Sequence, residues 1–296
     1  MRSGDDPAIV RAAEAIRAGR LVVFPTETVY GLGTNALDPA AVERIFAAKG
    51  RPRSSPLIVH VASVAMARKL AAEWPATAEK LAARYWPGPL TLVVAKRAVI
   101  PDIVTAGLPT VALRMPAHPL ALALIRAAGV PIAAPSANRF TELSPTAAAH
   151  IPQSLADVTL DGGPAAVGIE STVLSLVGTP TLLRPGTIPI TELEAIAGPI
   201  ALATAETPHA SPGMHPRHYS PRTPLYLGAA ARRGRGVVLR IGHEMPADAL
   251  AYAAALYDTL HALDKEHLDW IAVEPPPETP EWAGVLDRLR RACHDA

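Results

Sequence analysis

Polar residues and glycines gather at the end of the first predicted strand. The segment PTETVYGLG at 25–33 follows an apolar run at 21–24 and combines two hydroxyls, a carboxylate and a phenol with two glycines. A loop of this kind can bring its backbone close to a small ligand. An ordinary polar turn can have the same composition, because a short G-x-G pattern alone is a weak signal. We take 25–33 as a candidate ligand-binding loop.

Three cations lie at and just after the end of a helix that is predicted to stop at Gly50. They are Lys49, Arg51 and Arg53, and Glu43 is the counter-charge nearby in the sequence. Cations at a helix C-terminus stabilise the helix dipole. The same side chains can instead hold phosphate oxygens, lysine as a point charge and arginine as a planar fork. The residues alone favour neither interpretation.

Two titratable side chains interrupt apolar strands. His60 lies inside the run at 57–61, and Arg114 directly follows the run at 111–113. A lone histidine in a strand is more often a satisfied core residue than a ligand-binding one. A buried arginine is costly unless an anion pairs with it. We therefore expect a carboxylate or phosphate partner for Arg114.

Small polar residues also follow later apolar runs. Ser136 and Asn138 come after the strand predicted at 131–134, and the segment SPT at 144–146 is typical of a helix N-terminus. A helix N-terminus can bind an anion, although Ser144 as a simple N-cap explains the segment equally well. The segments GIEST at 168–172 and LRPG at 183–186 repeat the pattern of polar side chains beside glycine.

Strand and helix patterns alternate through the first 200 residues. This alternation predicts an α/β fold on one twisted sheet with mixed pairing. The strands are predicted at 21–24, 57–61, 90–95, 110–113, 131–134, 158–160, 171–176 and 181–183, and the helices at 7–18, 39–49, 63–72, 76–84, 117–128, 144–150 and 190–197. Beyond a proline-rich stretch, strands at 237–241 and 270–273 and helices at 248–263 and 281–292 predict a small second α/β domain.

The composition excludes several classes of protein. The 296 residues are 49% hydrophobic, which is enough to bury the cores of two domains. A formal net charge of +1 excludes attachment to nucleic acid or membrane by bulk charge. The single cysteine, Cys293, excludes a disulfide framework and cysteine-based metal sites. Because neither a signal peptide nor a membrane-spanning run is recognisable, we predict a cytoplasmic protein.

Taken together, the motifs resemble the YrdC-like threonylcarbamoyl-adenylate synthases in their longer, two-domain form. The resemblance implies a YrdC-like twisted mixed sheet with flanking helices at 1–198, a proline-rich linker and active-site lid at 199–224, and a small C-terminal Rossmann-like α/β domain at 225–296. It is carried, in chain order, by PTETVYGLG, AKGRP, PLIVHV, WPGPLTLV, VALRMP, APSAN, SPT, DGG, GIESTV, LRPG and the linker SPGMHPRHYSP.

The resemblance also implies an activity. Members of this family condense L-threonine, bicarbonate or CO2 and ATP to threonylcarbamoyl-adenylate and pyrophosphate, and the product serves the threonylcarbamoyl modification of a tRNA adenosine. The implied cofactor is Mg²⁺ carried by ATP, with no dedicated metal site on the protein. The implied partners are downstream tRNA threonylcarbamoyl-transferase proteins, with no membrane and no stable nucleic-acid binding.

The family's functional residues map onto matching positions of this chain. The resemblance implies threonine binding by Thr28, His60, Arg114 and Ser171. It implies ATP binding by Lys49, Arg51, Ser55, Thr110, Ser136, Asn138, Ser144, Arg184 and Tyr219, with Lys49 and Arg51 also catalytic and Tyr219 part of the lid. Two positions depart from the pattern: Ser55 stands where Asn is frequent, and Thr141 stands where Gly is common.

Two other functions are weighed against this one. A non-catalytic RNA-binding module would show tight, steeply salt-dependent tRNA binding and no threonine-dependent ATP turnover. The 4% aromatic content and the near-zero net charge argue against it. A carbamoyl-adenylate enzyme of hydrogenase maturation also contains a YrdC-like domain. It would need zinc-finger cysteines and an acylphosphatase-like segment, neither of which is found in this sequence.

Overall fold

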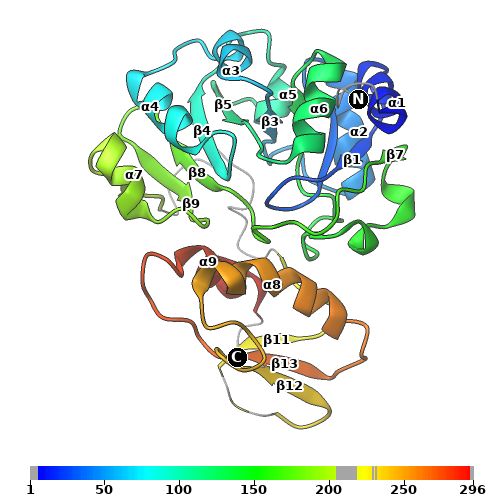
Figure 1. Ribbon diagram of the computed structural model, residues 1–296, viewed down its shortest axis with the longest axis vertical. Helices are drawn as coiled ribbons and strands as arrows, with labels where there is room; N and C mark the ends of the chain where they lie inside the picture. Colours follow the sequence, from blue (N-terminus) through cyan, green and yellow to red (C-terminus); the bar gives the residue numbers. More distant parts are fainter. Residues whose placement is uncertain (1–5, 205–218, 229, 231, 294–296) are drawn as a thin grey trace.

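A computed structural model describes residues 6–204, 219–228, 230 and 232–293. They form two units, a larger one at 6–204 and a smaller one at 219–293, which lie one above the other in Figure 1. Residues 211–218 of the linker motif predicted at 211–221, and most of the lid predicted at 199–224, lie outside the described residues. No helix within the described ranges is long and apolar enough to cross a membrane.

The larger unit contains a ten-stranded sheet in the order β10-β9-β8-β4-β5-β3-β6-β2-β1-β7. The sheet contains parallel pairs such as β3 with β5 and antiparallel pairs such as β4 with β5, so the predicted mixed sheet is confirmed. The sheet extends past residue 198, because its last strand is β10. The strands are β1 (Val22–Phe24), β2 (Gly31–Asn35), β3 (Ile58–His60), β4 (Leu90–Ala95), β5 (Thr110–Arg114), β6 (Ile132–Ala133), β7 (Val158–Thr159), β8 (Thr172–Ser175), β9 (Thr181–Arg184) and β10 (Ala201–Leu202).

Helices cover this sheet, and their ends follow the capping residues of the sequence. Asp38 accepts from two backbone N–H groups at the start of α2, and Gly50 ends α2 with a left-handed φ of 62°. Six of the seven predicted helical segments up to residue 200 are found. The helices are α1 (Pro7–Arg17), α2 (Pro39–Lys49), α3 (Val64–Leu70), α4 (Ala76–Tyr85), α5 (Asp102–Thr105), α6 (Pro119–Ala128) and α7 (Ile190–Ala197).

The helix predicted at 144–150 is wrong. Only two short 3-10 turns are found in this region, Ala148–His150 and Gln153–Leu155. The backbone of the predicted helix bonds elsewhere, because the carbonyls of Pro145 and Thr146 accept from Tyr30 and Ala165, both at 2.8 Å. The hydroxyl of Ser144 donates to a carboxylate rather than capping a helix. No helix dipole is therefore available here to bind an anion.

The candidate loop at 25–33 is shorter than predicted, because β2 begins at Gly31 and pairs antiparallel with β1. A Cβ atom on Gly33 would lie 2.5 Å from Ile132 Cγ2 and 2.7 Å from Phe24 Cε1. The glycine therefore allows close packing of neighbouring strands rather than a flexible loop. The remaining turn, residues 25–30, still carries the two threonines and the glutamate.

The smaller unit is the α/β unit that the sequence predicts. It has a three-stranded parallel sheet in the order β11-β13-β12, of which β11 was not predicted. The Asp248 side chain caps the first of its two helices. The elements are β11 (Leu225–Leu227), β12 (Gly236–Leu239), α8 (Ala249–Leu263), β13 (Trp270–Val273) and α9 (Ala283–Ala292).

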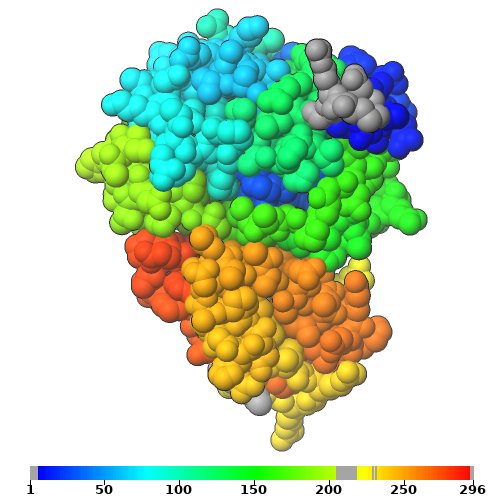
Figure 2. Space-filling model, in the orientation of Figure 1, coloured from blue at the N-terminus to red at the C-terminus, as the bar shows by residue number. Residues whose placement is uncertain are grey.

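Helices α8 and α9 face the larger unit, and the small sheet lies on their far side (Figure 1). The space-filling view in Figure 2 shows the two units in direct contact. Two glycines allow this approach: a Cβ atom on Gly168 would lie 2.3 Å from the carbonyl oxygen of Ala253, and one on Gly284 would lie 2.4 Å from that of Gly186. The backbones of the two units therefore touch at two points.

We predict that Gly168→Ala separates the units at the first of these points. Gly168 has a φ of 80°, so the alanine carries about 1–2 kcal/mol of left-handed strain in addition to the clash with α8. Gly178→Ala is the matched control, because Gly178 has a φ of 70° and no atom within 4 Å of the added Cβ. In urea unfolding, Gly168→Ala should lower the free energy of unfolding clearly more than Gly178→Ala does. An equal loss of unfolding free energy in the two variants would show that Gly168 is not needed for the contact between the units.

Candidate active site

A cavity lies over one face of the ten-stranded sheet. Alternate residues of a strand share a face, and His60 pairs with Arg114 in the register of β3 and β5, so both side chains reach this face. The cavity contains about 500 Å³ of space, including the part open to solvent. Its lining residues are Thr26, Thr28, Val29, Gly31, Arg51, Ile58, His60, Arg114, Ala134, Pro135, Ser136, Glu170, Arg184 and Tyr219.

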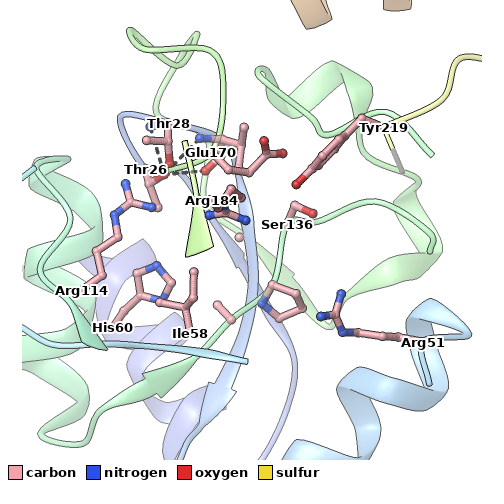
Figure 3. A pocket seen from close by; sticks show the side chains of 14 residues that line it. Thr26, Thr28, Arg51, Ile58, His60, Arg114, Ser136, Glu170, Arg184 and Tyr219 are labelled. Atoms are coloured by element: carbon pink, nitrogen blue, oxygen red, sulfur yellow. Dashed lines mark hydrogen bonds between the residues drawn. The ribbon is translucent and has the colours of Figure 1, made fainter. Parts of the chain in front are cut away.

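The lining side chains form two groups (Figure 3). One side of the cavity carries residues predicted to bind threonine: Thr28, His60 and Arg114. The other side carries residues predicted to bind ATP: Arg51, Ser136 and Tyr219. Glu170 and Arg184 lie between the two groups. The structure therefore brings seven of the predicted site residues to one cavity.

Arg114 is buried and paired with a carboxylate, as the sequence predicts. Its Nη2 donates to Glu27 Oε1 at 2.7 Å, and its Nε donates to the carbonyl of Gly88 at 3.3 Å. The other Glu27 oxygen accepts from the backbone N–H of Ala117 at 2.9 Å. Among the described residues, Nη1 of Arg114 has no hydrogen-bond partner, so this side of the guanidinium is available to a ligand.

His60 is held neutral in the wall of the cavity. Burial, together with the nearby charge of Arg114, lowers the pKa of His60 to about 3. Its Nδ1 is buried and has no hydrogen-bond partner in the described part of the chain. The hydroxyls of Thr26 and Thr28, which line the same cavity, are 2.9 Å apart. A neutral imidazole nitrogen with no protein partner fits a hydrogen bond to a bound molecule.

Arg51 brings positive charge to the opposite side. Its Nη2 donates to Ser55 Oγ and, at 3.2 Å, to the carbonyl of Pro56, whereas its buried Nε has no partner among the described residues. Burial lowers the pKa of Arg51 to about 10, with an opposing contribution from Tyr219 and a further lowering by Arg184. The group therefore stays charged at neutral pH. Ser55 holds Arg51 and does not itself line the cavity.

Lys49 supports this side of the cavity from behind. Its ammonium donates to the carbonyl of Ser136 at 2.6 Å and to the carbonyl of Asn138. Burial is the main reason why the pKa of Lys49 is well below its usual value. Asn138 is buried, and its Oδ1 has no partner in the described ranges. In this structure Lys49 holds the loop that presents Ser136, and it is not itself a lining residue.

Three further predicted residues lie outside the lining. Ser171 Oγ is 2.8 Å from Thr91 Oγ1 and accepts from Arg184 Nη2 at 3.2 Å. Ser144 Oγ donates to Glu170 Oε1. Thr110 begins β5, on the same face as Arg114 and four residues before it. The ligand contacts predicted for these three residues stay predictions.

Tyr219 is positioned by the smaller unit. It is 1% exposed, and its φ of 64° is unusual for a residue other than glycine. Its ring centroid is 6.0 Å from that of Tyr257 on α8 and 5.2 Å from the guanidinium carbon of Arg288 on α9. Thr141 is also left-handed, with a φ of 72°, at the position where the family commonly has glycine. The Thr141 carbonyl accepts from the N–H of Ser220 at 3.0 Å.

Two charged residues of the site were missed in the sequence. Glu170 belongs to the segment GIEST, but a single glutamate beside a strand gives no sign of its partners. Arg288 is fully buried on α9, and it lies on the helix face of Val285 and Ala292, three and four residues away. An arginine on the apolar stripe of an amphipathic helix was the available signal.

The residue types around the cavity suit an anion better than a bare cation. Arg51 and Arg184 bring positive charge, and both oxygens of Glu170 already accept hydrogen bonds. In the described ranges, no group of three or more His, Cys, Asp or Glu side chains converges on a point that could hold a metal ion. The arrangement fits a ligand that carries several negative charges.

Two family models together match most of the chain. The one described as "Telomere recombination", named for Sua5, YciO and YrdC, matches residues 14–186. The one described as "Threonylcarbamoyl-AMP synthase, C-terminal domain" matches residues 188–293.

Relatives of similar length are named threonylcarbamoyl-AMP synthase, as the second of these family models is. A threonylcarbamoyl-AMP synthase of Bacillus subtilis (strain 168) is 42% identical over 98% of this chain and 94% of its own. One from Pyrococcus abyssi is 42% identical over 95% of this chain and 92% of its own. The fold is similar to the crystal structure of P. abyssi Sua5 complexed with L-threonine, with a TM-score of 0.90, 41% identity, and coverage of 96% of this chain and 93% of that one.

We predict that His60 makes folding stability depend on pH. An unfolded histidine takes up a proton below about pH 6.5, whereas folded His60 does so only near pH 3. Stability is therefore lost as the pH falls from about 6.5 towards 3, by up to about 1.4 kcal/mol per pH unit. His60→Asn should reduce this slope in urea unfolding at a series of pH values. His261, with a pKa lowered to about 4, should retain its own contribution.

The control is His243→Asn, because His243 is exposed in the smaller unit. It should leave the slope unchanged. A slope that is the same in His60→Asn and in the unmodified chain would contradict the neutral, buried state of His60.

Proposed function

The chain belongs to the Sua5–YciO–YrdC family, in the form that carries the threonylcarbamoyl-AMP synthase C-terminal domain, and we propose that it is an L-threonylcarbamoyladenylate synthase. The reaction condenses L-threonine, bicarbonate or CO2 and ATP to threonylcarbamoyl-AMP and pyrophosphate. The single observation that carries the proposal is the cavity with an arginine–histidine pair on one side and uncompensated positive charge on the other.

Threonine fits the Arg114 side. Its carboxylate would bind Nη1 of Arg114, while Glu27 keeps Nη2 and fixes the plane of the guanidinium. Neutral His60 would accept a hydrogen bond from the amino group, and it avoids the repulsion that a protonated histidine would exert on an ammonium ion. The Thr28 hydroxyl lies on the same side. This arrangement directs the amine towards the middle of the cavity.

The triphosphate fits the Arg51 side. In the described part of the chain, neither Lys49 nor Arg51 forms an ion pair with a carboxylate, so an incoming anion would balance their charge. Arg184 Nε donates to the Ser171 carbonyl at 3.0 Å, which fixes the guanidinium. Arg184 lies between the Arg51 side and the threonine side of the cavity. That position suits the phosphate that reacts.

The chemistry then needs no covalent intermediate on the protein. The threonine amine attacks the carbon of bicarbonate and forms an N-carboxylate with loss of water, or it adds to CO2 with loss of a proton. An oxygen of this carbamate attacks the α-phosphorus of ATP. The bond to the β-phosphate breaks, and pyrophosphate leaves. The protein contributes orientation and stabilisation of the negative charge on the transferring phosphoryl group.

The remaining parts of the proposal concern the setting of the reaction. ATP would enter as its Mg²⁺ complex, with phosphate and water oxygens as ligands of the ion. The labile product would pass to tRNA threonylcarbamoyl-transferase proteins. We place the enzyme in the cytoplasm, without stable binding to membrane or nucleic acid, on the basis of its composition and single cysteine.

Pyrophosphate release tests the proposed function. The full chain is incubated with Mg²⁺, ATP and bicarbonate, with and without L-threonine, and pyrophosphate is measured by a coupled assay. Release that requires both L-threonine and bicarbonate is expected, and mass spectrometry should detect threonylcarbamoyl-AMP. Release at the same rate without threonine would overturn the proposal.

We also predict that Arg114→Met impairs threonine binding more than ATP binding. Removing one partner of a buried charge pair costs about 2–5 kcal/mol, so the KM for threonine should rise by at least about tenfold. The KM for ATP should change much less, because ATP is expected on the other side of the cavity. Arg126→Met, an exposed arginine on α6, is the matched control. An unchanged KM for threonine would remove Arg114 from the threonine site.

A further inference from the structure

Glu170 is an acidic group in a cavity that is expected to bind a polyanion. It is 6% exposed and lines the cavity beside Arg184. Left unbalanced, its carboxylate would repel phosphate oxygens and would attract the nearby guanidinium of Arg184. The site therefore needs a group that neutralises Glu170 and holds it in place.

The smaller unit supplies that group. Arg288 on α9 is 0% exposed, and its Nε donates to Glu170 Oε2 at 2.7 Å. Its Nη2 donates to the Glu170 carbonyl at 3.1 Å. Tyr257 on α8 also donates to Oε2, at 3.2 Å, and Ser144 donates to Oε1. Oε2 thus accepts from two side chains of the smaller unit, and Oε1 accepts from one side chain of the larger unit.

Arg288 also reaches the segment that carries Arg184. Its Nη1 donates at 2.9 Å to the carbonyl of Pro185, the residue directly after Arg184. The same nitrogen lies 2.7 Å from Asp287 Oδ2, so the charge of Arg288 is balanced by two carboxylates. One side chain of α9 thereby fixes two strand-end segments of the larger unit.

The protonation state of Glu170 agrees with this arrangement. Burial alone raises the pKa of a carboxyl group, but Arg288, Arg184 and the Ser144 hydroxyl together lower the pKa of Glu170 to about 2. Glu170 is therefore ionised at neutral pH. A buried ion pair of this kind is weak evidence for a role in stability, because apolar residues of similar volume often stabilise a fold as well.

We propose that Arg288 is a positioning residue of the nucleotide site, which neutralises Glu170 so that its carboxylate neither repels the phosphates of ATP nor competes with them for Arg184. The inference rests on the proposed function in one respect, the identity of the polyanion. It gives the smaller unit a defined part in the reaction, because the larger unit does not contain the cation that balances Glu170. Without Arg288, the unbalanced carboxylate of Glu170 repels the phosphates and competes with them for Arg184.

The test compares the affinity for Mg–ATP in the full chain and in four variants, by titration calorimetry without threonine. Arg288→Gln should weaken Mg–ATP binding by about tenfold or more, because an unbalanced carboxylate then faces the phosphates. Arg288→Lys keeps the charge but loses the planar fork, so its affinity should lie between those of Arg288→Gln and the unmodified chain. Arg290→Gln is the matched control on the same helix, since its side chain is 57% exposed and pairs with Glu278.

The double variant Glu170→Gln/Arg288→Gln separates positioning from structure. It removes both charges, so it should bind Mg–ATP more tightly than Arg288→Gln alone. Thermal unfolding is measured for both variants. If Arg288→Gln alone is unfolded, the double variant shows whether the two units fold once both charges are removed. Between variants that thermal unfolding shows to be equally folded, a purely structural role of Arg288 predicts no such difference in Mg–ATP affinity. A double variant as weak as Arg288→Gln, or an Arg288→Gln that binds as tightly as the unmodified chain, would overturn the inference.

The two proposals fail in distinguishable ways. Mg–ATP binding without threonine-dependent release of pyrophosphate would contradict the proposed synthase but would leave the role of Arg288 in nucleotide binding standing. Synthase activity with no effect of Arg288→Gln on Mg–ATP binding would contradict the role of Arg288 alone. An unmodified chain that binds no Mg–ATP would overturn both.

Discussion

The burial of positive charge around one cavity is the constraint on which the rest of the structure depends. Taking an ion out of water costs several kcal/mol unless the protein or a ligand replaces the lost hydration. Glu27 and Glu170 balance two of the buried cations, and carbonyl oxygens solvate a third. The side that carries Arg51 keeps an excess of positive charge for a ligand to balance. The cations concerned are Lys49, Arg51, Arg114, Arg184 and Arg288.

This constraint explains why the two units are built together. The larger sheet brings Arg114, Arg184 and the residues around them to one face, but it leaves the Glu170 carboxylate without its cation. Helix α9 supplies that cation, and α8 supplies a tyrosine hydroxyl to the same carboxylate. The glycines at 168 and 284 allow the close approach that these contacts need. The boundary between the units is therefore part of the site.

Local patterns in the sequence predicted the elements well, because caps and periodicity are local properties. They were wrong at 31–33 and at 144–150, where pairing and bonding with distant segments override local preference. Most residues that line the cavity belong to the motifs recognised in the sequence. The motifs could not show that Lys49 and Ser55 face other protein groups, or that Glu170 meets Arg288, which lies 118 residues further along the chain. Such contacts depend on the packing of two units and leave only weak local signals.

The central claim is that threonine and nucleotide occupy opposite sides of one cavity and meet near Arg184. The most direct measurement is a crystal structure of the full chain with L-threonine and a non-hydrolysable ATP analogue with Mg²⁺. The account predicts the threonine carboxylate on Arg114, the amino group beside His60, and the phosphates against Arg51 and Arg184. A threonine carboxylate bound at Arg51 or Arg184, or a nucleotide bound outside this cavity, would contradict the account.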